Sequence, residues 1–181
     1  MGGPAKPTLP VGGRSMLDRV LAAVTDAGPR VVVGPASLTL PPGVMQVSEQ
    51  PPGGGPVAAI AAGLAALDGG GDAAGTVAVL AADLPFLTPQ SIGTLRSAVW
   101  ESTVDGAVFV DGAGRRQTLC GIWRIAALRD RLDALDRLAG AALRHLLAGL
   151  RIAEVAGSGG GPPPWYDCDS PDDLHRAERW T

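Results

Sequence analysis

A short, uninterrupted apolar run near the middle of the chain limits the folds that are open to it. Residues 76–82 read Thr-Val-Ala-Val-Leu-Ala-Ala, and Asp83 follows directly. An apolar run of this length, without polar alternation, is typical of a strand that is buried on both faces, as in a parallel sheet. Because helices must cover both faces of such a sheet, the run predicts an α/β protein.

The segments around this run alternate between strand-like and helix-like patterns, and two helices follow one another only in the second half of the chain. The predicted strands are residues 30–33, 44–48, 76–82, 106–110, 117–125 and 151–155, with a short extended piece at 165–168; the predicted helices are residues 16–27, 56–68 and 89–101, two helices marked by leucines within 128–135 and 143–150, and a terminal helix from Pro171. A tight turn joins 106–110 to 117–125 as a hairpin. We therefore expect a single three-layer α/β domain, residues 1–181, with a mixed but mainly parallel sheet.

Composition excludes several classes of protein. Hydrophobic residues make up 46% of the 181 residues and charged residues 18%, a balance unlike that of disordered chains. The net charge of −3 and the 4% of aromatic residues offer no surface for nucleic acid. No apolar run reaches the roughly 18 residues of a membrane span. Cys120 and Cys168 lack the spacing of metal ligands and are typical of reduced core thiols, so we expect a cytoplasmic protein that binds neither nucleic acid nor a membrane.

Carboxylates at the predicted carboxyl ends of strands are the first candidates for chemistry, because ligands of open α/β sheets bind beyond these ends. Asp83 follows the buried strand, Glu49 follows the strand at 44–48, and Asp167 and Asp169 follow the last strand. A carboxylate in such a place suits Mg²⁺, which binds one or two carboxylates together with substrate phosphates. The alternative for Asp83 is that it only accepts hydrogen bonds from the turn after it.

A glycine loop and a lysine are the candidates for holding a phosphate. Gly53, Gly54 and Gly55 open the predicted helix at Pro56, where a nucleotide can approach the backbone closely and the helix dipole favours an anion. The loop matches neither common phosphate-binding glycine motif, and its alternative is a flexible connector. Lys6 lies among glycines and prolines, and its alternative is a solvated surface side chain.

Several stretches, taken together in their order and spacing, resemble the molybdenum cofactor guanylyltransferase family. They are EQPPGGGPVAAIAAGLAAL (49–67), LAADLPFLTP (80–89), GRRQTLCGIWR (114–124) and DCDSPDDLHRA (167–177), preceded by PAKPTLPVGGRSMLDRVLAAV (4–24). The resemblance covers nearly the whole chain. It implies a glycosyltransferase-A-like nucleotidyltransferase fold. It also implies that a first strand and a glycine-rich signature, roughly LAGGxSxRMG, stand before Met1.

By this resemblance, the protein joins GMP from GTP to molybdopterin and releases pyrophosphate, with Mg²⁺ as cofactor. Lys6 matches the lysine that neutralises the triphosphate, Asp83 the Mg²⁺-binding aspartate, and Asp169 a position that supplies a second metal ligand in related enzymes. Glu49 stands where the family has a nucleotide-contacting Asp, and it leads into the nucleotide-binding loop with Gly54 and Gly55. The alternatives are transfer of CMP to the same cofactor, transfer of a nucleotide to a sugar phosphate, and a truncated, inactive relative that acts as a binding protein.

Overall fold

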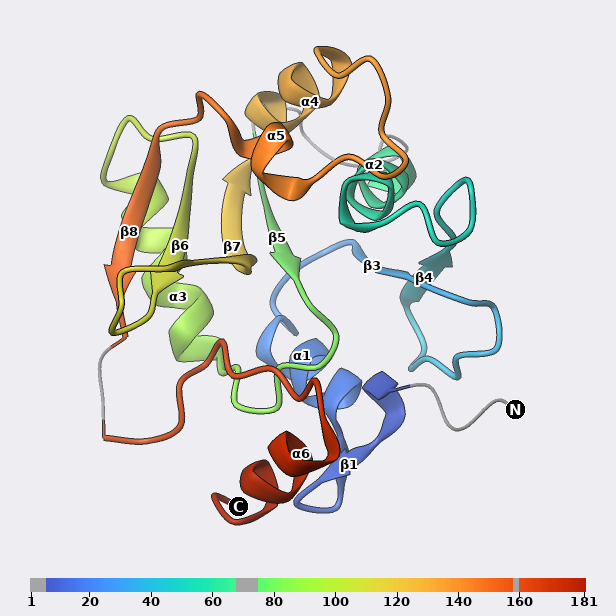
Figure 1. Cartoon of the computed structure of the whole chain (residues 1–181), viewed down its shortest axis with the longest axis vertical. Helices are drawn as coiled ribbons and strands as arrows, with labels where there is room; N and C mark the ends of the chain where they lie inside the picture. Colours follow the sequence, from blue (N-terminus) through green and yellow to red (C-terminus); the bar gives the residue numbers. More distant parts are fainter. Residues whose placement is uncertain (1–5, 68–74, 158–159) are drawn as a thin grey trace. The chain divides into compact units, whose positions relative to one another are not determined.

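The computed structural model describes residues 6–67, 75–157 and 160–181, in which helices follow single strands or pairs of strands through the first half of the chain (Figure 1). In chain order the elements are the 3-10 turn η1 (Lys6–Thr8), β1 (Pro10–Val11), β2 (Arg14–Ser15), α1 (Met16–Ala23), β3 (Arg30–Val33), β4 (Val44–Val47), α2 (Pro56–Leu67), β5 (Thr76–Leu80), α3 (Pro89–Trp100), β6 (Gly106–Val110), β7 (Arg116–Arg124), α4 (Ile125–Asp133), α5 (Leu143–Leu147), β8 (Ile152–Ala156) and α6 (Pro171–Glu178). This order confirms the predicted α/β class.

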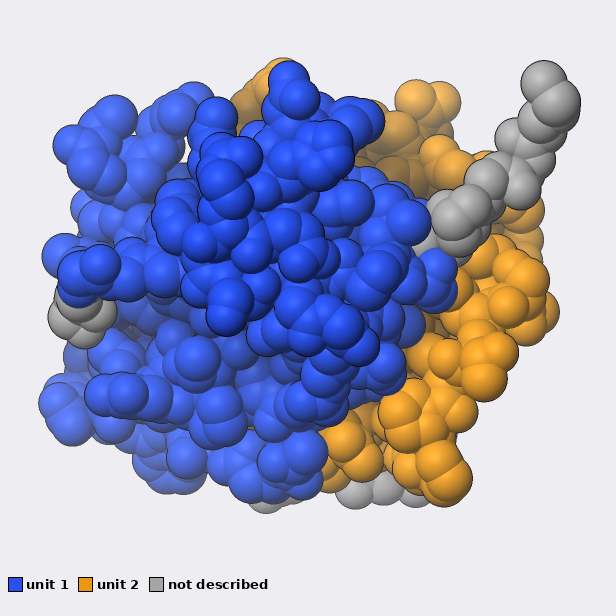
Figure 2. Space-filling view, turned by 90° about the horizontal axis from the view of Figure 1, so that it is seen from below, with its two compact units in different colours: residues 1–26, 78–122, 152–181 blue, residues 27–77, 123–151 orange. Residues whose placement is uncertain are grey.

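The elements are distributed over two compact units, coloured separately in Figure 2. Unit 1 comprises Met1–Asp26, Ala78–Ile122 and Ile152–Thr181, and unit 2 comprises Ala27–Val77 and Trp123–Arg151. Each unit therefore combines segments that are far apart in the sequence. None of the described helices has the length and apolar character that crossing a membrane requires.

The larger sheet has four strands in the order β5-β7-β6-β8, and most of its residues belong to unit 1. β6 and β8 pair in parallel, with Gly106 opposite Ile152 and Val110 opposite Ala156. β6 and β7 are neighbours joined by residues 111–115 alone, which is too short for the crossover that parallel strands need. These two strands therefore form the predicted hairpin, and the sheet is mixed.

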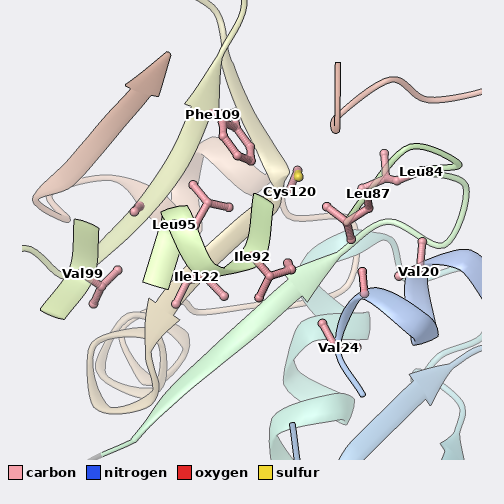
Figure 3. Close-up of a cluster of buried hydrophobic side chains, with 12 residues drawn as sticks. Val20, Val24, Leu84, Leu87, Ile92, Leu95, Val99, Phe109, Cys120 and Ile122 are labelled. Carbon is pink, nitrogen blue, oxygen red and sulfur yellow. The ribbon is translucent and has the colours of Figure 1, made fainter. Parts of the chain in front are cut away.

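A cluster of buried apolar side chains fills unit 1 (Figure 3). α3 packs on β6 and β8, and α1 packs on α3. In α3, Ile92, Leu95 and Val99 recur at three- and four-residue spacing, so they share the face that points into the cluster. Thr88 fixes where this helix begins, because its hydroxyl accepts a hydrogen bond from the N–H of Ser91.

Unit 2 contains a smaller sheet and the helices α2, α4 and α5. β3 and β4 pair in parallel, with Arg30 opposite Val44, and α2 packs on both strands. Gly63 lies on the packed side of α2, where an added Cβ would come within 3.3 Å of Val33. We expected one sheet, but hydrogen bonding divides the described strands into three sheets, because an apolar pattern identifies a strand and not the strand it pairs with.

Five predicted elements differ from the structure by more than one residue, or by type. The helix predicted within 128–135 is α4, Ile125–Asp133, which begins three residues earlier and ends two residues earlier. α1 ends at Ala23 and β5 at Leu80, and α5 covers only Leu143–Leu147, before Gly149 takes a φ of +80° that favours glycine. Residues 165–168 do not form a strand, because the N–H of Tyr166 bonds to the carbonyl of Pro163 within a turn. The last residue of the predicted helix 56–68 lies outside the described residues.

The interior position of Leu95, which is 0% exposed, gives a test of this core. We expect Leu95→Ala to lower the free energy of unfolding of the protein by about 2–5 kcal/mol, since the substitution removes buried atoms and leaves a cavity. Leu119→Ala on β7 is the matched control, because Leu119 is 36% exposed and its loss should cost about 1 kcal/mol or less. Urea unfolding followed by circular dichroism measures both; equal losses would contradict the assignment of Leu95 to the core.

Candidate active site

Three of the predicted site residues meet in unit 1. The Nζ atom of Lys6 lies 2.5 Å from Oδ2 of Asp83 and 2.6 Å from Oδ1 of Asp169. One ammonium group thus contacts two carboxylates that are far apart in the sequence. The three side chains are unequally exposed, at 37% for Lys6, 16% for Asp83 and 76% for Asp169, so the cluster lies at the surface with Asp83 as its most enclosed member.

The loop between β5 and α3 holds Asp83. Leu84 follows it and is buried, and the N–H of Leu87 bonds to the carbonyl of Leu84 within a tight turn. Phe86 packs its ring against Tyr166, with 5.9 Å between ring centroids. This contact ties the loop that carries Asp83 to the C-terminal segment that carries Asp169.

Asp169 and Lys6 are anchored by a second, smaller group of buried residues. Cys168 precedes Asp169 and is only 3% exposed; it packs with Val11, Met16 and Ala177. The following residue, Ser170, is the N-cap of α6, in a capping box with Asp173. Lys6 begins η1, and the N–H of Leu9 donates a hydrogen bond to the carbonyl of Lys6, which closes the turn next to this group. The two exposed charges are therefore positioned by buried neighbours.

The charges shift one another's pKa values. Burial alone lowers the pKa of Lys6, but the hydrogen bonds to Asp169 and Asp83 outweigh it and hold that pKa above its ordinary value. The hydrogen bond from Lys6 lowers the pKa of Asp169. Partial burial raises the pKa of Asp167, and the negative charges of Asp169 and Asp83 raise it further, while Lys6 offsets part of this effect. Asp167 therefore belongs electrostatically to the cluster.

The carboxylates of Asp83 and Asp169 are the metal ligands that this cluster could offer. Because Asp83 and Asp169 contact the same nitrogen, their oxygens lie no farther apart than the sum of the two contact distances. Carboxylate oxygens suit Mg²⁺, which takes only one or two of them and completes its shell with water and phosphate oxygens. In the part of the chain that the structure describes, no group of three or more His, Cys, Asp or Glu is arranged to hold a metal by itself.

The other predicted site residues, Glu49, Gly54 and Gly55, belong to unit 2. Oε1 of Glu49 accepts a hydrogen bond from the N–H of Gly53 at 3.1 Å, and the N–H of Gly54 bonds to the carbonyl of Pro51. The loop is thus bonded internally. An added Cβ on Gly54 would lie 2.9 Å from that same carbonyl oxygen, so the tight turn requires glycine. A contact of this loop with a nucleotide stays a prediction.

Asp167 is the member of the cluster that the sequence analysis named among the strand-end carboxylates but to which it assigned no metal or nucleotide role. It stands two residues before Asp169, with the buried Cys168 between them. The signal in the sequence is its spacing, because Asp167 stands only two residues from the matched Asp169, while the effect of Asp83 on the pKa of Asp167 became visible only in the structure.

Removing the lysine charge tests the electrostatics of the cluster. In Lys6→Met, we expect the pKa of Asp169 to rise to its ordinary range and the pKa of Asp167 to rise further, because both lose a stabilising positive charge. Carboxyl ¹³C NMR titration measures both values. Arg96→Met is the control, since Arg96 pairs with Asp26 and should leave Asp169 unchanged. An unchanged pKa of Asp169 in Lys6→Met would contradict the ion pair.

Solved structures show which known proteins share this fold. The 2-C-methyl-D-erythritol 4-phosphate cytidylyltransferase of Thermus thermophilus matches with a TM-score of 0.70 at 22% identity, covering 96% of this chain and 92% of that one. The molybdopterin-guanine dinucleotide biosynthesis protein A of Archaeoglobus fulgidus matches with a TM-score of 0.67 at 19% identity, covering 96% and 89%. Both likenesses confirm the nucleotidyltransferase fold.

Sequence comparison shows the family. The molybdenum cofactor guanylyltransferase of Bradyrhizobium sp. (strain ORS 278) is 27% identical over 183 residues, which cover 99% of this chain and 86% of that protein. Residues 1–155 match the MobA-like NTP transferase domain. Since this match spans most of the chain, the protein belongs to the MobA-like NTP transferase family and is a nucleotidyltransferase.

Proposed function

We propose that the protein transfers GMP from GTP to molybdopterin and releases pyrophosphate, with Mg²⁺ as cofactor. The observation that carries this proposal is the contact of Lys6 with Asp83 and Asp169, because phosphoryl transfer needs a fixed cation and carboxylate ligands for a metal at one point. The choice of GTP and molybdopterin is supported by the name of the Bradyrhizobium relative.

In the proposed reaction, an oxygen of the acceptor phosphate attacks the α-phosphorus of GTP. The bond from that phosphorus to the oxygen bridging to the β-phosphate breaks, and pyrophosphate leaves with this oxygen. Lys6 keeps its proton because its pKa is raised, so it can exchange the carboxylates for phosphate oxygens and offset their charge. Asp83 and Asp169 are then free to act as metal ligands. When bound, Mg²⁺ supplies further neutralisation of the phosphates.

Direct attack by the acceptor also agrees with the state of the two cysteines. Burial raises the pKa of Cys120 to about 12 and that of Cys168 to about 11. Both are therefore thiols at neutral pH, and the thiolate is the nucleophilic form. Neither side chain is suited to carry a covalent nucleotidyl intermediate, and the proposed reaction needs none.

Asp83 gives the sharpest test of this function. We expect Asp83→Asn to lower the rate of pyrophosphate release from GTP and molybdopterin by about 100-fold or more, since it removes a proposed metal ligand and a partner of Lys6. Asp26→Asn is the matched control, because it makes the same chemical change at an exposed ion pair with Arg96. Near-normal turnover in Asp83→Asn, or no pyrophosphate release by the wild-type protein, would contradict the proposal.

Cytidylyl transfer is a second candidate, favoured by the likeness to the Thermus cytidylyltransferase. The shift in melting temperature with each of the four triphosphates and Mg²⁺ separates the two, because a ligand of the native state stabilises it by mass action. We expect a larger shift with GTP than with CTP at equal concentration. A larger shift with CTP would replace the guanylyl assignment by the cytidylyl one.

A further inference from the structure

The end of α6 contacts each of the three segments that carry the charges of the Lys6 cluster. α6 packs on β1, and both belong to unit 1 (Figure 1). Beyond the helix, the N–H of Trp180 bonds to the carbonyl of Ala177, and the N–H of Thr181 bonds to the carbonyl of Glu178. These bonds hold residues 178–181 in a tight turn against the helix, so their side chains have fixed neighbours.

Trp180 joins two of the three segments through a group of three aromatic rings. Its ring lies 5.5 Å from that of Phe86 and 5.1 Å from that of Tyr166, centroid to centroid, and both pairs are edge-to-face. Phe86 stands three residues after Asp83, and Tyr166 stands three residues before Asp169. Aromatic pairs of this geometry attract each other beyond the area they bury. The indole therefore draws together the two segments whose carboxylates contact one ammonium group.

Glu178 and Thr181 hold the third segment, which runs from Lys6 to the turn between β1 and β2. Both carboxylate oxygens of Glu178 accept the N–H of Gly12 at 3.2 Å, in a charge-assisted hydrogen bond. Thr181 lies against the same turn, since a Cβ added to Gly12 would come within 2.9 Å of its Cβ. The N–H of Leu9 bonds to the carbonyl of Lys6, so the backbone between the lysine and this turn is itself held.

The ion pairs of the cluster are too exposed to fix this geometry by themselves. Such pairs gain little free energy in water, and they lose side-chain entropy when a long lysine is held in one place. The Trp180 ring is different, because it is large and rigid, has only two rotatable bonds and is 45% exposed, so that about half of it is packed. The stiffer contact therefore sets the position of the softer one.

We propose that Trp180, supported by Glu178, is a positioning residue that holds Lys6, Asp83 and Asp169 at the spacing of the cluster. Trp180 acts through the two neighbouring rings and Glu178 through the β1–β2 turn. The inference rests on the proposed function for its catalytic consequence, whereas the positioning itself is a property of the free protein. In the proposed reaction a shift of the charges by about 1 Å would cost on the order of 100-fold in rate.

Lys6 is the only lysine among the 181 residues, so its side chain can be observed directly. In protein labelled with ¹³C-lysine, NMR relaxation of the Lys6 Cε methylene gives its order parameter, which reports motion on the ps–ns timescale. We expect Trp180→Ala to lower this order parameter toward that of a free lysine side chain. Trp180→Phe should keep it near the wild-type value, because a phenyl ring still bridges its two neighbours. Trp100→Ala is the matched control, since Trp100 ends α3 and is 72% exposed.

Turnover gives a second readout. We expect Trp180→Ala to lower kcat/KM for pyrophosphate release by about 10- to 100-fold, because the charges are displaced without being removed. Trp180→Phe should restore most of the activity, and Trp100→Ala should leave it at the wild-type value. A role in stability alone would lower the melting temperature of Trp180→Ala and leave both the Lys6 order parameter and the activity unchanged in the folded protein.

The outcomes separate this inference from the proposed function. A wild-type order parameter for Lys6 in folded Trp180→Ala, an equal loss of order in Trp100→Ala, or a Lys6 side chain that is already mobile in the wild-type protein would each overturn the positioning role. A wild-type protein that releases no pyrophosphate would overturn the proposed function, and the order parameter would still decide the positioning. Thermal unfolding followed by circular dichroism identifies a variant that fails to fold. If Trp180→Ala does, Glu178→Ala decides: a lowered Lys6 order parameter supports the inference, and a wild-type value overturns it.

Discussion

One ammonium group shared by two carboxylates is the interaction on which the candidate site depends. Lys6, Asp83 and Asp169 come from three distant parts of the sequence, and ion pairs this exposed contribute little to stability. Their geometry must therefore be held by buried neighbours. The packing of Cys168 with Met16, and of Phe86 with Tyr166, supplies that support, so the charges are arranged by the core and do not arrange it.

The local charge balance explains how such a site can exchange ligands. Asp83 and Asp169 contact the single ammonium of Lys6, and Asp167 adds a third negative charge, so the proposed divalent cation would meet an excess of negative charge. In the proposed reaction, a cation held by the carboxylates would leave the ammonium of Lys6 to contact the phosphates of a nucleotide. The same lysine offsets the charge of the carboxylates in the free protein and, in the proposed reaction, the charge of the substrate. One ammonium group can contact either partner, because carboxylates and phosphates both present negatively charged oxygens to it.

The fold by itself leaves the substrate open. A cytidylyltransferase and a protein of molybdopterin-guanine dinucleotide synthesis both match this chain over 96% of its length. Their shared architecture provides the strand ends and helix starts at which phosphates bind, and such a scaffold supports many acceptors. Discrimination must then come from side chains around these shared positions.

The sequence by itself determined most of the element types and the family, because apolar period, turn residues and motif spacing are local properties. It also singled out Lys6, Asp83 and Asp169, which the structure brings together, while their role in catalysis stays a prediction. It did not determine strand pairing: nothing in the apolar runs of β3 and β5 specifies the partner of either, so the division into three sheets was missed. The contacts of Lys6 with Asp83 and Asp169, and the effect of Asp83 on the pKa of Asp167, were decided only by tertiary structure. They arise where segments distant in sequence meet, and the physical reason is that electrostatic interactions depend on distances through space.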